Sequence, residues 1–579
     1  MTNAPQANAA APTGLRAPCR PRWLWLAPVG PLLLLGVDAA LEPAARLALL
    51  ARLLYLTPPL ALSLFAVAAA RRWRAAAVPW RSAVALWPGL VVAALLVLAV
   101  LSASPPAMRM QFDESSLVAV SQGMHAERAA TMATGALPFD GGSLRLESTV
   151  DKRPPLFAFL VSVAHDLVGP RIENAFAVNA LLLGVGFVLL FAAARAWRGL
   201  AAGLAAPVLV TAVPLSALVA TSAGFELLAV VLFVGVLWAA VDVVQQARRG
   251  PVPEPSSWLL LALGCLFAQA RYESLPAAAL VFALVAFAVR GRVRWTRGLV
   301  GMAIAAVWLA GPVVVQLVYA QNPDFYPEAA GRPLVAVAHL LAHAPPFAQQ
   351  WFAPALQNPL PGVLAIAGAL AYAVRLARRR AGFLDLVVLL PVAAVTGAAL
   401  LWFYGDVREA TALRLFVPAA WACALLPLVA LPHLPRRAGW LLLAAAVVLA
   451  GLRLNAVARG ETMPPLRNAE LAEAMVRAAG EVDGDDTAHT LWVAVTAQHL
   501  IVHGRSALPP RSFAARVREV QQAVRDGHVR RIFVLTTPLD LEFAPAYGDP
   551  QDVLRATGAE FVRRFDGDLP LSVYRVRLR

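Results

Sequence analysis

Phe112-Asp113-Glu114-Ser115-Ser116 begins, and Asp151-Lys152-Arg153-Pro154-Pro155-Leu156 nearly ends, the first long polar interruption in a very apolar sequence. This region, from Gln111 to Gly169, has neighbouring carboxylates at one end and neighbouring cations at the other. Apolar segments flank it, so both charged ends are expected beside membrane helices. Lys152 is the only lysine in the sequence. Its position in the most charged loop either reflects a requirement for a compact ammonium group or arose by chance in a lysine-poor sequence.

The composition indicates a polytopic α-helical membrane protein. Of 579 residues, 59% are hydrophobic and 15% are charged, and the mean hydropathy is +0.65, whereas soluble domains carry about 25% charged residues. The formal net charge of +15 does not indicate a nucleic-acid partner, because the arginines form short runs between apolar segments. This distribution follows the positive-inside rule and suits contacts with anionic membrane lipids. The runs are Arg71-Arg72-Trp73-Arg74, Arg248-Arg249, Arg290 to Arg297, Arg378-Arg379-Arg380 and Arg436-Arg437.

Apolar runs of about 17–25 residues, the length that crosses a bilayer, predict about thirteen transmembrane helices within residues 1–455. The first is interpreted as a retained helix, because it lacks a clear small-residue cleavage site. With the N-terminus inside and strict alternation, every arginine run falls on the cytoplasmic side. The loop at 105–172, the loop at 321–357, the turn at 405–413 and the C-terminal tail then fall outside. The spans are expected at 23–40, 48–70, 83–104, 173–194, 201–220, 225–241, 257–272, 274–290, 298–320, 360–376, 382–404, 414–431 and 438–455.

Two segments of the first outer loop are expected to be helical without crossing the membrane. Residues 154–168 are apolar but short for a span, and they are interpreted as a helix at the outer interface. Residues 113–134 are interpreted as an amphipathic helix on the membrane surface, which would hold Asp113 at the boundary between water and lipid. The residues that share one face of this helix are Asp113, Leu117, Val120 and Met124.

Beyond about residue 456 the charged and polar residues return, which predicts a small extracytoplasmic α/β domain at 456–579. Strands are expected at 490–496, 531–537 and 571–576, and helices at 511–525 and 551–557. The segment has no glycine-rich phosphate motif and no nucleophile elbow. It is therefore interpreted as an external cap that packs on the membrane domain.

The charged motifs together resemble those of the GT-C glycosyltransferases that use polyprenyl-phosphate sugars, among them the protein O-mannosyltransferases and the lipid A aminoarabinose transferases. That family places an acidic pair after a membrane helix and a Lys-Pro-Pro-Leu or His-Pro-Pro-Leu motif later in the same outer loop. Asp113-Glu114 and Arg153-Pro154-Pro155-Leu156 are similar, and an Arg/Asn-containing helix follows at 171–179. Here Arg153 directly precedes the prolines and Lys152 stands one place earlier, so either residue could take the family's phosphate-contacting role.

Transfer of a sugar from a lipid phosphate to a hydroxyl needs a group that takes the hydroxyl proton and cations that stabilise the leaving phosphate. Asp113 is the candidate base and Glu114 its substitute, unless either only pairs with an arginine. The candidate phosphate contacts are Lys152, Arg153, Arg271 and Arg408.

Several of these charged residues have a second interpretation. Arg271 and Glu273 either contribute to a substrate cavity or form a local pair at a hairpin turn. Glu226 either faces that cavity or caps its helix. Arg408 and Arg414 flank the outer end of a span, where the family often has an arginine followed by a proline-rich helix. Arg414 either resembles that arginine or only reaches to the interface.

No cofactor is expected. Cys19, Cys265 and Cys423 are scattered without metal or disulfide spacing. The external histidines, His125, His339 and His343, lack metal spacing with any acid and are interpreted as surface residues. A divalent cation is not indicated, because a monophosphate donor would meet several arginines.

The resemblance implies an integral-membrane glycosyltransferase, inverting in stereochemistry, in a bacterial inner membrane with its active site facing the periplasm or exterior. Its partners would be a polyprenyl-phosphate sugar, an acceptor lipid, glycan or protein, and membrane lipids. A transporter or flippase is an alternative, although the sequence lacks repeated halves and its acids are expected at the membrane boundary. A non-catalytic scaffold of the cell envelope is the third hypothesis.

Overall fold

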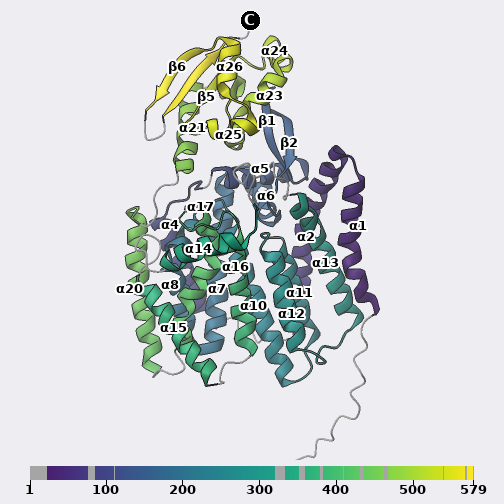
Figure 1. The fold of residues 1–579 in the computed structure, drawn as a ribbon, viewed down its shortest axis with the longest axis vertical. Helices are drawn as coiled ribbons and strands as arrows, with labels where there is room; N and C mark the ends of the chain where they lie inside the picture. The colour runs from purple at the N-terminus through teal and green to yellow at the C-terminus, as the bar shows by residue number, and fades with distance from the viewer. Residues whose placement is uncertain are drawn as a thin grey trace, which may run out of the picture.

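A computed structural model describes residues 22–75, 85–109, 111–319, 333–350, 359–378, 383–408, 410–430, 436–461, 467–484, 486–538, 540–566 and 570–577. Long helices form one bundle, and two short helices, α5 (Gln111–Glu127) and α6 (Leu156–Val168), lie at one end of it. A C-terminal domain with a five-stranded sheet lies beyond them (Figure 1). The expected fold class, a polytopic helical membrane protein with a small C-terminal α/β region, is confirmed.

Each of the expected spans coincides with a helix or with a pair of consecutive helices. The segment expected at 201–220 is broken, because Val213 takes an extended conformation before Pro214. The helices of the bundle are α1 (Leu26–Ala40), α2 (Pro43–Ala75), α4 (Trp87–Ala103), α7 (Glu173–Arg198), α8 (Leu200–Thr211), α9 (Pro214–Ala220), α10 (Glu226–Arg249), α11 (Glu254–Ala268), α12 (Ser274–Ala288), α13 (Arg297–Tyr319), α14 (Val337–Gln350), α15 (Pro359–Ala377), α16 (Phe383–Leu401), α17 (Ala410–Leu413), α18 (Val417–Leu425), α19 (Pro427–Ala430) and α20 (Arg436–Ala458).

The number of helices that cross the membrane remains a prediction. Within the described residues, six helices are long and apolar enough to cross on their own. A seventh span results if α8 and α9, bent by 76°, are counted together. Several other apolar helices are shorter, among them α4, α11 and α12. The expected figure of about thirteen would therefore require these shorter helices to span as well.

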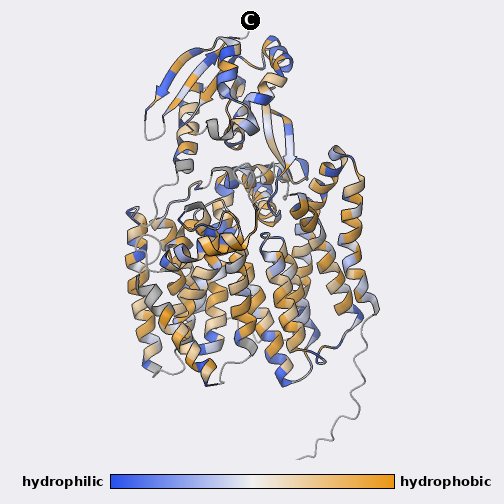
Figure 2. Ribbon diagram, viewed as in Figure 1, coloured by the Kyte–Doolittle hydropathy of each residue, from blue (hydrophilic) through white to orange (hydrophobic). Residues whose placement is uncertain are grey.

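Hydrophobic residues dominate the bundle, and hydrophilic residues gather at its end away from the C-terminal domain (Figure 2). Arginine runs finish α2 and α10 and begin α20 at that end. The distribution agrees with the expected topology, in which the C-terminal domain and the arginine runs lie on opposite sides of the membrane.

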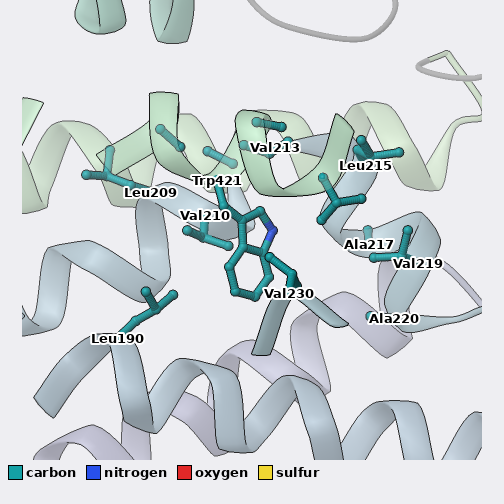
Figure 3. Packing of buried hydrophobic residues seen from close by; sticks show 14 of the residues in the cluster. Leu190, Leu209, Val210, Val213, Leu215, Ala217, Val219, Ala220, Val230 and Trp421 are labelled. Carbon is teal, nitrogen blue, oxygen red and sulfur yellow. The ribbon is translucent and has the colours of Figure 1, made fainter. Parts of the chain in front are cut away.

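Trp421 of α18 anchors the late helices of the bundle to its centre. Its side chain is 2% exposed and packs among residues of α7, α8, α9 and α10, including Leu190, Val210 and Val230 (Figure 3). The indole Nε1–H donates to the Ser216 hydroxyl at 3.0 Å, which satisfies the ring's one polar group. The helix that begins just after Arg414 is thereby fixed against α10.

Helix α5 corrects two details of the sequence-based expectation. It ends at Glu127, not at 134, and Arg128 then takes a positive φ of 54°. Leu117, Val120 and Met124 are buried, as the helical spacing predicted. The opposite side of the helix is covered too, because it packs between α6 and the C-terminal domain and does not lie on a free membrane surface.

A β-hairpin between α5 and α6 was not predicted. It pairs β1 (Thr131–Phe139) with β2 (Gly142–Val150). Asp140 and Gly141 form its turn with φ values of 48° and 74°, and the Asp-Gly sequence favours such a two-residue loop. The Asp-Gly pair was therefore a sequence signal for the hairpin, but the strands beside it lie in a long polar region and were not predicted.

The C-terminal domain has the strand order β4-β3-β5-β7-β6. The three expected strands are confirmed as β3 (Thr490–Val493), β5 (Arg531–Thr536) and β7 (Leu571–Val576). Strands β4 (Ser506–Leu508) and β6 (Glu560–Phe565) were missed, because the first is short and the second is largely exposed and charged. The helices are α21 (Arg467–Asp483), α22 (Ala497–Val502), α23 (Pro510–Ala515), α24 (Val517–Arg525), α25 (Asp540–Tyr547) and α26 (Pro550–Thr557).

The hairpin joins the first outer loop to the C-terminal domain. Glu147 of β2 accepts hydrogen bonds from Ser512 at 2.7 Å and from Arg516 at 2.8 Å. Leu137 of β1 contributes to the apolar core under the C-terminal sheet. The C-terminal domain is therefore attached to the loop that carries Asp113 and Arg153.

Candidate active site

Seven charged residues form a continuous series of ion pairs at the end of the bundle nearest the C-terminal domain. Carboxylates and guanidinium groups alternate along the series, so that each arginine contacts two acids. In order, its members are Asp151, Arg153, Asp113, Arg414, Glu226, Arg271 and Glu273. We call this arrangement the ion-pair series.

Asp113 stands at the middle of the ion-pair series. One of its carboxylate oxygens accepts from Arg153 and the other from Arg414. Arg153 also contacts Asp151 at 2.7 Å, and Arg414 also contacts Glu226 at 3.0 Å. Asp113 is thus held on both sides by planar cations.

Arg271 continues the ion-pair series toward the turn between α11 and α12. It lies 3.2 Å from Glu226 and 3.2 Å from Glu273. The local pair is therefore present, and Arg271 also reaches a carboxylate on α10, whereas its role toward a substrate stays a prediction. Glu226, in the first turn of α10, is paired with two arginines.

Local structure fixes each member of the ion-pair series. Asp113 and Glu226 lie in the first turns of α5 and α10, where the helix dipole favours negative charge. The loop that carries Asp151 and Arg153 is held by Gln316 of α13, whose amide donates to the carbonyls of both residues at 2.8 and 2.7 Å. A loop with two backbone contacts of this kind presents its guanidinium in a defined position.

Most of this charge is removed from water. The side chains of Glu226, Arg153 and Arg271 are 3%, 9% and 13% exposed, whereas Asp113 is 23% exposed. Buried charges are costly unless they are paired, and the alternation supplies a partner for each. Asp113 is nevertheless open enough for a ligand to approach it.

A small cavity adjoins the ion-pair series on the side of the helix bundle. Its charged wall consists of Glu226, Arg271, Glu273 and Arg414. The rest of its lining is mainly apolar and comes from α10, α11, α16 and α18, with Phe233, Phe267, Val395 and Pro418 among the residues. Such a site offers cations beside an apolar surface.

The remaining sequence candidates lie outside the ion-pair series. Glu114 is buried beside Asp113, but it accepts a hydrogen bond from the backbone N–H of Arg109 at 2.5 Å. Lys152 is half-buried in the same loop as Arg153. Arg408 is exposed and pairs with Asp406 at 2.5 Å, so the structure does not bring it to Asp113.

Two members of the ion-pair series were missing from the sequence candidates. Arg414 had two interpretations, and it bridges Asp113 and Glu226. Asp151 is next to Lys152 and Arg153 in the sequence, and this position in a charged run was the signal that could have identified it. One other expectation was wrong: His343 is 6% exposed, and its Nδ1 lies 3.1 Å from the Leu400 carbonyl.

Within the described residues, no group of three or more His, Cys, Asp or Glu residues is placed to hold a metal ion. The expectation that a metal is dispensable stays a prediction, because the donor is not part of this structure.

The arrangement of helices is that of the GT-C fold, which confirms the fold expected from the resemblance. Among solved structures, ArnT from Cupriavidus metallidurans bound to undecaprenyl phosphate is similar at 14% identity with a TM-score of 0.51; the match covers 83% of this chain and 97% of that one. The oligosaccharyltransferase AglB from Archaeoglobus fulgidus, in complex with an inhibitory peptide and a dolichol-phosphate, matches at 13% identity with a TM-score of 0.47, covering 82% of this chain and 72% of that one. No protein-family model and no curated protein sequence matches.

Proposed function

We propose that this protein is an integral-membrane glycosyltransferase that moves a sugar from a polyprenyl-phosphate donor to an acceptor hydroxyl. The observation that carries the proposal is the position of Asp113 between Arg153 and Arg414, next to a cavity with an apolar wall. A carboxylate, several cations and an apolar surface are the three elements that this reaction requires.

The donor would use both parts of the cavity. Its phosphate would meet Arg271 and Arg414 at the charged wall. Because the cavity has a volume of only about 30 Å³, the lipid tail would lead away from it along the apolar surfaces of α10, α11 and α16. Planar guanidinium groups can bind phosphate in a bidentate manner, which fixes the orientation of the leaving group. Lys152 or Arg153 would complete the phosphate site from the loop before α6.

The chemical step would be a single displacement. The acceptor oxygen forms a bond to the anomeric carbon while the bond between that carbon and the phosphate oxygen breaks. The bonding electrons pass to the phosphate, whose growing charge the arginines stabilise. The acceptor proton passes to Asp113, and the sugar configuration is inverted. Charge neutralisation by the arginines would make a divalent cation unnecessary.

The ion pairs suggest an order of binding. Two cations that contact Asp113 favour its negative form and oppose proton uptake. A donor phosphate that draws Arg153 and Arg414 toward itself would leave Asp113 freer to accept the proton. We therefore propose that the donor binds before the acceptor reacts, which would also protect the donor from water.

The acceptor class, whether lipid, glycan or protein, stays open. The location supports a site on the outer face of a bacterial inner membrane, because the ion-pair series lies at the end of the bundle that bears the C-terminal domain, opposite the arginine runs (Figure 2). The same location weighs against a transporter, whose substrate site would lie near the membrane midplane. A scaffold would not need a buried series of ion pairs beside a cavity.

The test is a transfer assay with purified protein in nanodiscs, a polyprenyl-phosphate sugar and candidate acceptors of the three classes. The double variant Lys152→Ala, Arg153→Ala should bind the donor about tenfold or more weakly, since charge-assisted hydrogen bonds contribute about 1.5–3 kcal/mol. Arg459→Ala, which removes an exposed arginine paired with Glu461, is the control and should bind donor normally. Unchanged donor affinity and turnover in the double variant would exclude these residues as the phosphate site, and absence of donor binding by the wild-type protein would contradict the whole proposal.

A further inference from the structure

A second and larger cleft lies between the helix bundle and the C-terminal domain, with a volume of about 810 Å³. Its walls come from α5, the start of α7, and the helices α21 and α22. No member of the ion-pair series lines it. Gln122, which does, is nine residues beyond Asp113 on α5, which is about 180° around the helix at 3.6 residues per turn. The two sites therefore face opposite sides of α5.

The cleft carries charges of both signs. Arg171, before α7, and Arg477, on α21, supply positive charge, and Glu173 and Glu473 supply negative charge. In the part of the chain that the structure describes, Arg477, Glu173 and Glu473 form no ion pair within 4 Å. Side chains of both charges around one space, with three of them outside any ion pair, suit a ligand that carries complementary charges.

His499 supplies an independent observation. Its side chain is 98% buried, being 2% exposed, and it lines the cleft. Its Nε2 lies 3.2 Å from the Ala472 carbonyl and must donate to it, so Nδ1 is an acceptor. That Nδ1 is buried without a hydrogen-bond partner. A buried acceptor left unpaired is costly. Because Nδ1 is closed off from solvent, a ligand that donates a hydrogen bond would reach it once the His499 ring turned toward the cleft.

The cleft opens above a lipid-facing surface. Ile172, just before α7, and Phe176 of α7 are among its apolar lining residues. Further along α7, Ala177, Leu181 and Val185 follow Glu173 at helical spacing, and all three are exposed. An exposed apolar face on a membrane helix faces acyl chains. Since the walls of the cleft come from α5, the start of α7, α21 and α22, its charged part would lie at the level of lipid head groups.

We propose that this cleft binds the head group of a phospholipid that carries both a phosphate and a primary ammonium group. The phosphate contacts Arg171 and Arg477, and the ammonium contacts Glu473 or Glu173. On binding, the His499 ring turns so that its Nδ1 accepts a hydrogen bond from the ammonium. The acyl chains follow the exposed face of α7. Because Arg477 belongs to the C-terminal domain and Arg171 to the helix bundle, the bound lipid joins the two parts of the protein. This site is independent of the proposed sugar transfer.

The test uses the full-length protein in detergent, titrated with short-chain phosphatidylethanolamine and followed by native mass spectrometry and thermal unfolding. We expect a one-to-one adduct and a raised melting temperature. Phosphatidylglycerol, which lacks the ammonium, and free phosphoethanolamine, which lacks the chains, should each bind at least about tenfold more weakly, a difference of about 1.4 kcal/mol.

Two variants and a control locate the site. Arg477→Gln and Glu473→Gln should each weaken phosphatidylethanolamine binding by about tenfold. Arg525→Gln removes an exposed arginine of α24 that does not line the cleft, and it should bind the lipid normally. Equal binding of phosphatidylglycerol would overturn the assignment of the ammonium contacts. Equal binding of free phosphoethanolamine would show a soluble ligand in place of a lipid, and normal lipid binding by Arg477→Gln would remove the site from this cleft.

Discussion

The two ends of α5 are held by opposite kinds of interaction. At the N-terminal end, Asp113 lies between two arginines within the ion-pair series. Toward the other end, Ser121 belongs to a buried and uncharged network with His165 of α6 and Asn174 of α7. One helix therefore joins a charged site to a neutral one about two turns away.

The neutral network leaves no polar group of His165 without a partner. The Asn174 amide nitrogen can only donate, so Nδ1 of His165 accepts a hydrogen bond from it at 2.7 Å. Nε2 then carries the proton and donates to the Ser121 hydroxyl at 2.9 Å, and that hydroxyl donates to the Val118 carbonyl at 2.7 Å. Such a network fixes the position of α5 but has nothing to offer a ligand. In the ion-pair series, by contrast, a phosphate could replace a carboxylate as the partner of an arginine, as the proposed donor site requires.

Asp113→Asn should have the largest effect on the charged end. The amide keeps the size of the side chain but cannot take the acceptor proton. We expect turnover to fall by about two to four orders of magnitude, with kcat and kcat/KM falling together. Donor affinity should be kept or increased, because Arg153 and Arg414 lose a competing carboxylate. A transfer assay and a separate donor-binding measurement would distinguish the two quantities.

Glu114→Gln is the matched control for that variant. Glu114 is the neighbouring acid, but its carboxylate accepts from the Arg109 backbone, so a smaller loss is expected. A larger loss in Glu114→Gln than in Asp113→Asn would move the base to Glu114. Full activity in both variants and in their combination would refute acid–base catalysis by this pair.

Arg414→Gln tests the member of the series whose role the sequence left open. Donor affinity should fall by about 10- to 100-fold, as for the loss of one strong contact to phosphate. Arg414→Lys should recover part of the affinity, because it restores the charge without the planar geometry. Arg408→Gln, which removes an exposed arginine, should change donor affinity less than twofold; a larger loss there than in Arg414→Gln would contradict the proposed phosphate site.

The sequence allowed prediction of those features that depend on residues close together along the chain. Hydropathy gave the helices, and adjacent charges identified Asp113 and Arg153 as residues of interest. The contact between Asp113 and Arg414 joins residues 301 positions apart, and no local pattern specifies such a partner. The same limit applies to the hairpin, since its docking on the C-terminal domain depends on Glu147 meeting Arg516. Short-range signals therefore predicted the elements, whereas long-range packing selected which charges meet.

His165→Ala should break the neutral end of α5. It removes one buried hydrogen bond from Asn174 and one from Ser121 and opens a cavity, at a cost of about 2–4 kcal/mol. The apparent melting temperature in detergent should fall, while donor affinity at a permissive temperature stays near the wild-type value. His165→Gln, which keeps both hydrogen-bonding functions, should lose less. Equal melting temperatures for the wild type and His165→Ala would show that the network does not fix α5.

Acidification should weaken the same network by a smaller amount. Helix α6 is too short to span, and within it burial, aided by the nearby His125, lowers the pKa of His165 to about 4. An unfolded histidine titrates near 6.5. Between these pH values the unfolded chain binds a proton at this histidine and the folded protein does not. The contribution of neutral His165 to the free energy of unfolding is therefore complete above about pH 6.5 and is lost as the pH falls toward 4.

We therefore expect the apparent melting temperature to decrease between pH 7 and pH 5, and to decrease less in His165→Gln. Part of the decrease should remain in that variant, because burial also lowers the pKa of His499 to about 3 and of His503 to about 4. Asp166 and Arg128 lie beside His125 and form ion pairs there, so the comparison needs constant ionic strength. If wild type and His165→Gln lose stability in parallel over this range, His165 is not kept neutral by its surroundings, and the contrast between the two ends of α5 would have to be sought in packing alone.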